Sequence, residues 1–161
     1  RPIPEKNRKR AIRIAAYAQH QYGSGTLVML GPLSPEEKEQ LNRTELRFLH
    51  VDSSANVGYV MRHSDVLLVT STREGLPGVV LEALAMGTPV VASNIPSIAS
   101  LDGNVSGLTL CDLNNSDKVW ADTLHNVTRE DNRNEIAADL KATEYTLEAV
   151  GKRYLELWKI S

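Results

Sequence analysis

Short apolar runs alternate with amphipathic stretches along this chain of 161 residues. Apolar runs bounded by turn residues are typical of strands buried in a parallel sheet, and the stretches between them have the length and period of helices. This alternation predicts an α/β fold with a parallel sheet covered by helices on both faces. The predicted strands are residues 26–30, 46–51, 65–69, 90–92 and 108–111, and the predicted helices are residues 8 to about 21, 35–43, 57–63, 79–86, 117–127, about 132–141 and about 143–159.

Residues 70–92, TSTREGLPGVVLEALAMGTPVVA, read as strand end, glycine-bearing turn, helix and strand. This order makes one βαβ unit, and ligands of open α/β sheets bind at the edge where such a turn lies. Gly75 and Gly78 leave backbone N–H groups uncovered, and Pro77 suits the first position of the helix. Uncovered N–H groups at a helix start favour an anion such as a phosphate. An ordinary loop without a ligand is the alternative.

Glu82 favours the interpretation that this turn binds a ligand. The helix that contains it is otherwise apolar on every face, which predicts a buried helix. A carboxylate buried there is costly unless it is hydrogen-bonded, and sugar or ribose hydroxyls would satisfy it. Alternatively, Glu82 points outward near a helix start and only complements the helix dipole. A second carboxylate, Glu74, stands just before the same turn, so we favour the ligand.

Composition narrows the class of protein. Hydrophobic content of 42%, charged content of 24% and a net charge of −2 are typical of one globular domain and do not favour nucleic-acid binding. The sequence contains no apolar run long enough to span a membrane and no signal peptide. Because it begins with Arg1, we expect it to be a piece of a larger protein. Histidine spacing suggests no metal site, and the single cysteine, Cys111, is expected to be a buried structural thiol.

The sequence around these two acids resembles the signature of a known protein family. Glu74 and Glu82 stand in E-G-x-P-x-x-x-x-E-A-x-A-x-G-x-P-V-V-A, which resembles the E-x7-E signature of retaining glycosyltransferases with the GT-B fold, of the family 4 type. The resemblance implies a Rossmann-like parallel sheet and one nucleotide-sugar-binding domain over residues 1–161, the carboxyl-terminal half of a GT-B enzyme. It places the first strand of this domain and an amino-terminal acceptor domain outside the sequence, so the isolated domain is expected to be inactive.

The resemblance also implies an activity: hexosyl transfer from a nucleoside diphosphate sugar to an acceptor in polysaccharide or glycolipid synthesis. We expect a uridine nucleotide, no metal and no further cofactor. The expected partners are the donor and the acceptor domain, with peripheral membrane association through that domain, and the expected location is the cytoplasm at the inner face of the membrane. A nucleotide-sugar epimerase and a non-catalytic nucleotide-binding or scaffold module are the alternatives.

By the same resemblance, Glu74 faces the transferred sugar, and Arg1 and Lys6 hold the diphosphate as catalytic cations. Glu82 accepts hydrogen bonds from ribose hydroxyls. Without the resemblance, the basic opening of the chain is a solvated helix start. The nucleotide-binding turn comprises Gly75, Leu76, Pro77, Gly78 and Val79. Residues 52–56 are expected beside the nucleoside, with His50 at the sheet edge or simply on the surface.

Overall fold

The computed structural model describes residues 3–23, 25–51, 57–128, 132–146 and 149. All five predicted strands are present, and their ends differ from the prediction by two residues at most. The strands are β1 (Leu27–Leu30), β2 (Phe48–Val51), β3 (Leu67–Val69), β4 (Val90–Ser93) and β5 (Leu108–Cys111). The helices are η1 (Pro4–Lys6), α1 (Arg8–Tyr22), α2 (Pro35–Arg43), α3 (Val57–Arg62), α4 (Gly78–Ala85), α5 (Pro96–Ala99), α6 (Asp117–Val127) and α7 (Arg133–Lys141).

Every strand pair in the described part of the chain is parallel, as predicted, but the strands form two sheets rather than one. β1 pairs with β2, and β4 lies between β3 and β5. Hydrophobic runs predict strands but do not specify their hydrogen-bonding partners, so the division could not be foreseen. β4 is buried along its whole length, as expected for the central strand of the larger sheet.

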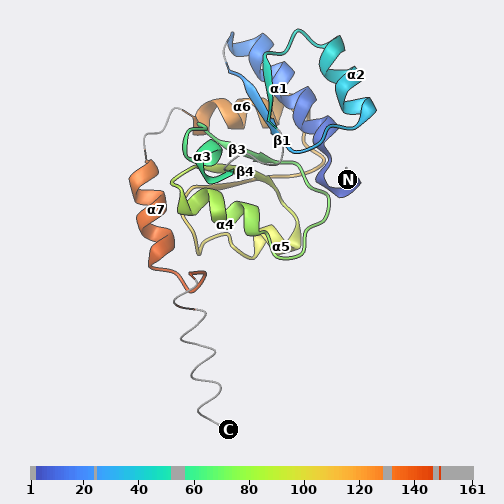
Figure 1. Cartoon of the computed structure of the whole chain (residues 1–161). Coiled ribbons are helices and arrows are strands. Elements are labelled where there is room, and N and C mark those ends of the chain that lie inside the picture. The colour runs from blue at the N-terminus through green and yellow to red at the C-terminus, as the bar shows by residue number, and fades with distance from the viewer. Residues whose placement is uncertain (1–2, 24, 52–56, 129–131, 147–148, 150–161) are drawn as a thin grey trace.

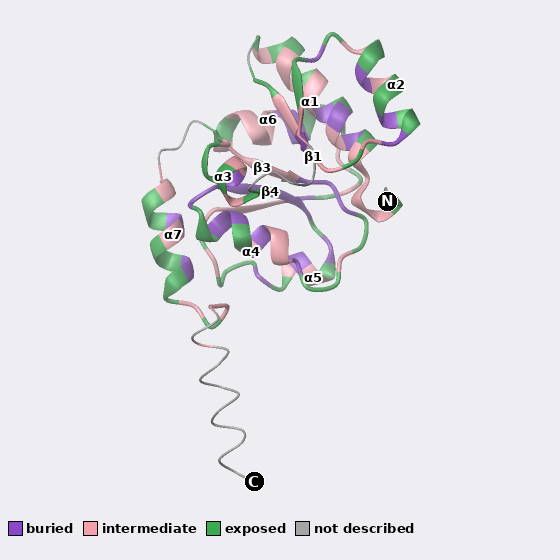
Figure 2. Cartoon of the chain, in the orientation of Figure 1, coloured by how far each residue is buried: buried purple, intermediate pink, exposed green. Residues whose placement is uncertain are grey.

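Helices cover both faces of the larger sheet (Figure 1). Val90 and Ala92 of β4 belong to a core cluster with residues of α4 and α7, whereas Val91 packs with residues of α1 and α6. This division follows from the pleat, because successive side chains of a strand point to opposite faces. Buried positions accordingly gather on β4 and on the inner sides of the helices, while outer helix faces are exposed (Figure 2).

Helix α1 links the two sheets through two of its sides, because residues two positions apart point in nearly opposite directions from a helix. Ile12 packs with Met29 and Leu41 beside β1, and Ile14 packs with Val91 and Trp120 beside β4. Both isoleucines are fully buried. Replacing a buried isoleucine with alanine typically costs about 2–5 kcal/mol, so the two positions fix the start of α1 against both sheets.

Local hydrogen bonds explain two helix ends. Ser34 caps α2: its hydroxyl accepts from the amide of Glu37 at 3.1 Å, and the Glu37 carboxylate accepts from the amide of Ser34 at 2.8 Å. The helix predicted over about 143–159 does not begin there, since residues 143–146 form bends and a turn. The Thr143 hydroxyl donates to the Leu140 carbonyl at 2.7 Å and so ends α7. Most of the remaining predicted helix lies outside the described residues.

Candidate functional site

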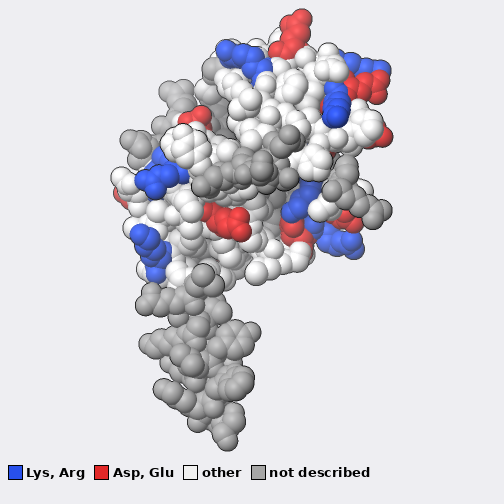
Figure 3. All heavy atoms as spheres, viewed as in Figure 1, with Lys and Arg blue, Asp and Glu red and all other residues white. Residues whose placement is uncertain are grey.

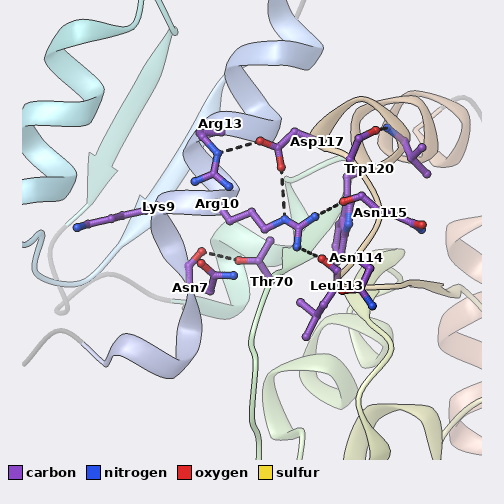
Figure 4. Close-up of polar contacts among 12 residues, drawn as sticks. Asn7, Lys9, Arg10, Arg13, Thr70, Leu113, Asn114, Asn115, Asp117 and Trp120 are labelled. Atoms are coloured by element: carbon purple, nitrogen blue, oxygen red, sulfur yellow. Dashed lines mark hydrogen bonds and ion pairs between the residues drawn. The ribbon is translucent and has the colours of Figure 1, made fainter.

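The amino-terminal segment lies against the carboxyl end of β3. The Thr70 hydroxyl donates to the carbonyl of Asn7 at 3.0 Å, as Figure 4 shows, and the amide of Thr72 donates to the carbonyl of Glu5 at 2.8 Å. Asn7 adopts the left-handed conformation between η1 and α1, which asparagine tolerates better than most residues. These contacts bring the residues before α1 to the edge where ligands of α/β sheets bind.

Lys6 and Glu74, two predicted site residues, meet at this edge. The Lys6 Nζ lies 2.7 Å from Glu74 Oε1, and the two side chains are 39% and 11% exposed. The hydroxyl of Ser71 donates to the same oxygen at 2.5 Å. The Ser71 carbonyl in turn accepts from the hydroxyl of Ser93 at 2.5 Å. The carboxylate is therefore held by a cation from η1 and a hydroxyl from the end of β3.

The predicted nucleotide-binding turn is open, with two differences from expectation. No heavy atom lies within 4 Å of the point where a Cβ would stand on Gly75, and Leu76 is 82% exposed. Pro77 is the N-cap of α4 rather than its first helical residue, because the helix begins at Gly78. The amide of Gly78 is also not uncovered: it donates to the Leu76 carbonyl at 2.8 Å. The following residue, Val79, is half-buried.

Glu82 is exposed, so the predicted burial of this carboxylate is wrong. The buried residues of α4 are Val80, Ala83 and Leu84, and they occupy one face of the helix. Apolar residues elsewhere on this segment are not necessarily buried: Met86, just beyond the helix, is 41% exposed. The Glu82 side chain leans towards the turn, with Oε1 4.0 Å from the Cβ position of Gly78. Its carboxylate therefore lies beside the amino end of α4.

Two other predicted contributors cannot be placed: Arg1 and residues 52–56 lie outside the described residues. The ring Nε2 of His50 lies 2.8 Å from the Gly31 carbonyl, at the carboxyl ends of β1 and β2. Cys111 is buried as predicted, and burial raises the pKa of its thiol. Over the described part of the chain, His, Cys, Asp and Glu form no group able to hold a metal ion.

Arg10 is a buried anchor that the sequence did not reveal, because the basic run containing it suggested a solvated helix start. It is 8% exposed, and its Nη1 and Nη2 donate to the carbonyls of Leu113 and Asn115, each at 2.5 Å (Figure 4). The guanidinium also lies 5.2 Å from the centre of the Trp120 ring, and its Nε is 3.4 Å from Asp117. Arg10 thus fixes α1 to the segment after β5, through contacts that no local pattern encodes.

Surface charge and helix composition add two observations. On the face shown in Figure 3, basic and acidic side chains are interspersed over the described surface, in keeping with the net charge of −2. Among the helices of the described residues, none is long and apolar enough to cross a membrane.

Comparison with known proteins decides the family. The sequence model described as "Glycosyl transferases group 1" matches residues 4–129. The chain belongs to this family. It is 31% identical over 124 residues to the putative glycosyltransferase EpsF of Bacillus subtilis, covering 74% of this chain and 32% of EpsF. It is 36% identical over 112 residues to the Vi polysaccharide biosynthesis protein VipC/TviE of Salmonella typhi, covering 66% of this chain and 19% of that protein.

Solved structures agree on the fold. The crystal structure of TarM superposes with a TM-score of 0.77 at 18% identity, covering 98% of this chain and 33% of TarM. Anabaena HepE, solved in complex with UDP and glucose, gives 0.76 at 22% identity, covering 100% of this chain and 47% of HepE. This group 1 glycosyltransferase chain is therefore a GT-B domain, and it spans about a third or less of the curated relatives named above.

Proposed function

We propose that this domain binds the donor in a retaining, metal-independent glycosyltransferase of the family 4 type. The enzyme would transfer a hexosyl unit from a nucleoside diphosphate sugar to an acceptor hydroxyl. The observation that carries the proposal is the meeting of Lys6 and Glu74, which are 68 positions apart, at the sheet edge beside the open turn. A cation and a carboxylate placed there suit the two parts of a nucleotide sugar, its phosphates and its hydroxyls.

Lys6 supplies the charge that such a reaction needs. Negative charge develops on the leaving diphosphate as the glycosidic bond breaks, and fixed cations stabilise it without a metal. Lys6 is one such cation, and it lies within the described residues. We assign the role of the second cation to Arg1. In the turn, residues from Gly75 to Val79 would approach the donor closely, since the space around Gly75 is open.

The two carboxylates have separate tasks. Glu82 is exposed beside the amino end of α4, where it can accept hydrogen bonds from ribose hydroxyls. Such charge-assisted bonds contribute about 1.5–3 kcal/mol. Glu74 would face the transferred sugar. Both acids belong to one βα turn, whereas the acids of a glycosidase flank the scissile bond, so we assign neither as a hydrolytic acid or base. The leaving phosphate would act as the base.

The names of similar proteins support a proposal about the donor nucleotide and the biosynthetic role. VipC/TviE is named for polysaccharide biosynthesis, and HepE was solved with UDP and glucose. We therefore propose a uridine nucleotide donor and a role in polysaccharide or glycolipid synthesis, in the cytoplasm at the inner face of the membrane. An amino-terminal acceptor domain would complete the cleft and mediate membrane association. The domain alone would bind nucleotide weakly and would not catalyse transfer.

Calorimetric titration with UDP, GDP and ADP tests this function. We expect saturable binding of UDP, weakened about 10-fold or more by Glu82→Ala, as the loss of charge-assisted hydrogen bonds requires. Glu39→Ala is the matched control, because Glu39 is an exposed helical glutamate whose surface ion pair with Arg43 contributes little. Absence of binding by all three nucleotides, or equal losses in both variants, would contradict the proposal.

A further inference from the structure

Glu74 is ion-paired with Lys6, the cation that the phosphates of the donor would need. Its Oε1 lies 2.7 Å from Lys6 Nζ. Ser71 donates to the same oxygen at 2.5 Å and is 1% exposed, so the carboxylate is fixed from the protein side. A carboxylate offers the lysine ammonium an anionic oxygen acceptor, as a phosphate group does.

We propose that Ser71 is a positioning residue that holds Glu74 on Lys6 as an internal substitute for the donor phosphate. The inference rests on the donor-binding function proposed above. When a nucleoside diphosphate arrives, its phosphate displaces the carboxylate from Lys6. Glu74 keeps its hydrogen bond from Ser71 and turns its free acceptor capacity to the sugar hydroxyls.

The two partners of Glu74 differ in the way this exchange requires. Ser71 is immobilised, because its carbonyl accepts from the hydroxyl of Ser93, which is fully buried. Lys6 is partly exposed, and its ammonium has three donors that can pass from one anion to another. The weaker, solvent-facing contact is therefore the one that opens.

The negative charge of Glu74 should affect the binding of UDP differently from the binding of UDP-glucose. A carboxylate beside the phosphate site competes with the diphosphate for Lys6 and repels it. For UDP, which has no sugar, this competition is uncompensated. For UDP-glucose, hydrogen bonds from sugar hydroxyls to the carboxylate offset it. Removing the charge of Glu74 should strengthen UDP binding and weaken the preference for UDP-glucose over UDP.

The test is calorimetry with UDP and UDP-glucose on the whole chain and its variants. We expect Glu74→Gln to bind UDP about two- to fivefold more tightly, the range that a partly exposed ion pair allows. Its ratio of UDP-glucose to UDP affinity should fall. Ser71→Ala should lower the same ratio, because the carboxylate is no longer aimed. Thr128→Ala is the control, since Thr128 is exposed just after α6 and its hydroxyl donates to the carbonyl of His125 in the same helix, and both of its affinities should be unchanged.

A second measurement separates this inference from the function on which it rests. In the nucleotide-free protein, the NMR signal of the Lys6 ammonium should shift in Glu74→Gln and in Ser71→Ala but not in Thr128→Ala. Weaker UDP binding by Glu74→Gln, or an unchanged affinity ratio and ammonium signal in Ser71→Ala, would overturn the inference while leaving the function standing. Failure of the unaltered chain to bind either ligand would overturn both.

Discussion

Replacing Gly107 with alanine should destabilise the fold through one identifiable contact. Gly107 precedes β5 with a φ of +79°, and its carbonyl accepts from the amide of Val90 in the central strand at 2.8 Å. A Cβ at this position would stand 2.6 Å from Cδ1 and 2.7 Å from Cγ1 of Ile136. Ile136 is 1% exposed and packs in the main core cluster, so it has little room to retreat.

Two costs add at this position. A residue with a Cβ in the left-handed region loses about 1–2 kcal/mol relative to glycine. Forcing an extra methyl group into a filled core costs a further 1–3 kcal/mol, or about 2–5 kcal/mol together. Gly103 separates the two terms, because its φ is +75° but no heavy atom lies within 4 Å of its Cβ position. Gly103→Ala should lose only about 1–2 kcal/mol.

Guanidinium chloride unfolding followed by circular dichroism measures both variants. Gly107→Ala should have the lower unfolding midpoint, and the difference between the variants should shrink when Ile136→Ala is added to each. Equal losses for the two glycine variants would refute the packing argument and leave backbone conformation as the whole effect. A difference that persists in the Ile136→Ala background would show that another neighbour causes it.

Two further predictions concern buried groups. Arg10→Met should lower the free energy of unfolding by about 3 kcal/mol, because two charge-assisted hydrogen bonds to carbonyls are lost. Arg13→Met, at a 54% exposed side chain, should change it by less than about 1 kcal/mol. Equal losses for the two variants in chemical denaturation would contradict the anchor role of Arg10. Cys111 should resist thiol reagents at pH 8 in the folded chain and react rapidly in denaturant, because burial raises its pKa and leaves little thiolate; rapid labelling of the native chain would contradict this.

Features encoded within a few residues were predictable from the sequence. Ser34 three positions before Glu37 specifies its own capping box, and both bonds are present. The strand β5 has the predicted bounds, because turn residues delimit its apolar run. Such features need only the propensities of neighbouring residues, which the sequence gives directly.

Features that depend on distant partners were not predictable in the same way. Arg10 lies in a basic run and reads as solvated, yet the carbonyls it contacts are more than 100 positions away. Glu82 lies in an apolar helix and reads as buried, yet only one face of that helix is covered in the described structure. Composition reports how many apolar side chains a helix has, and only the tertiary structure decides which of its faces is covered.

The candidate site combines both kinds of information, and this explains why its parts were predicted unequally. Gly75 and Glu82 belong to one turn and helix, so their proximity follows from the local sequence. The contact of Lys6 with Glu74 requires the amino-terminal segment to lie against the end of β3, which Thr70 and Thr72 secure by hydrogen bonds to that segment. A perturbation of these two bonds should therefore displace Lys6 while leaving the turn and Glu82 in place.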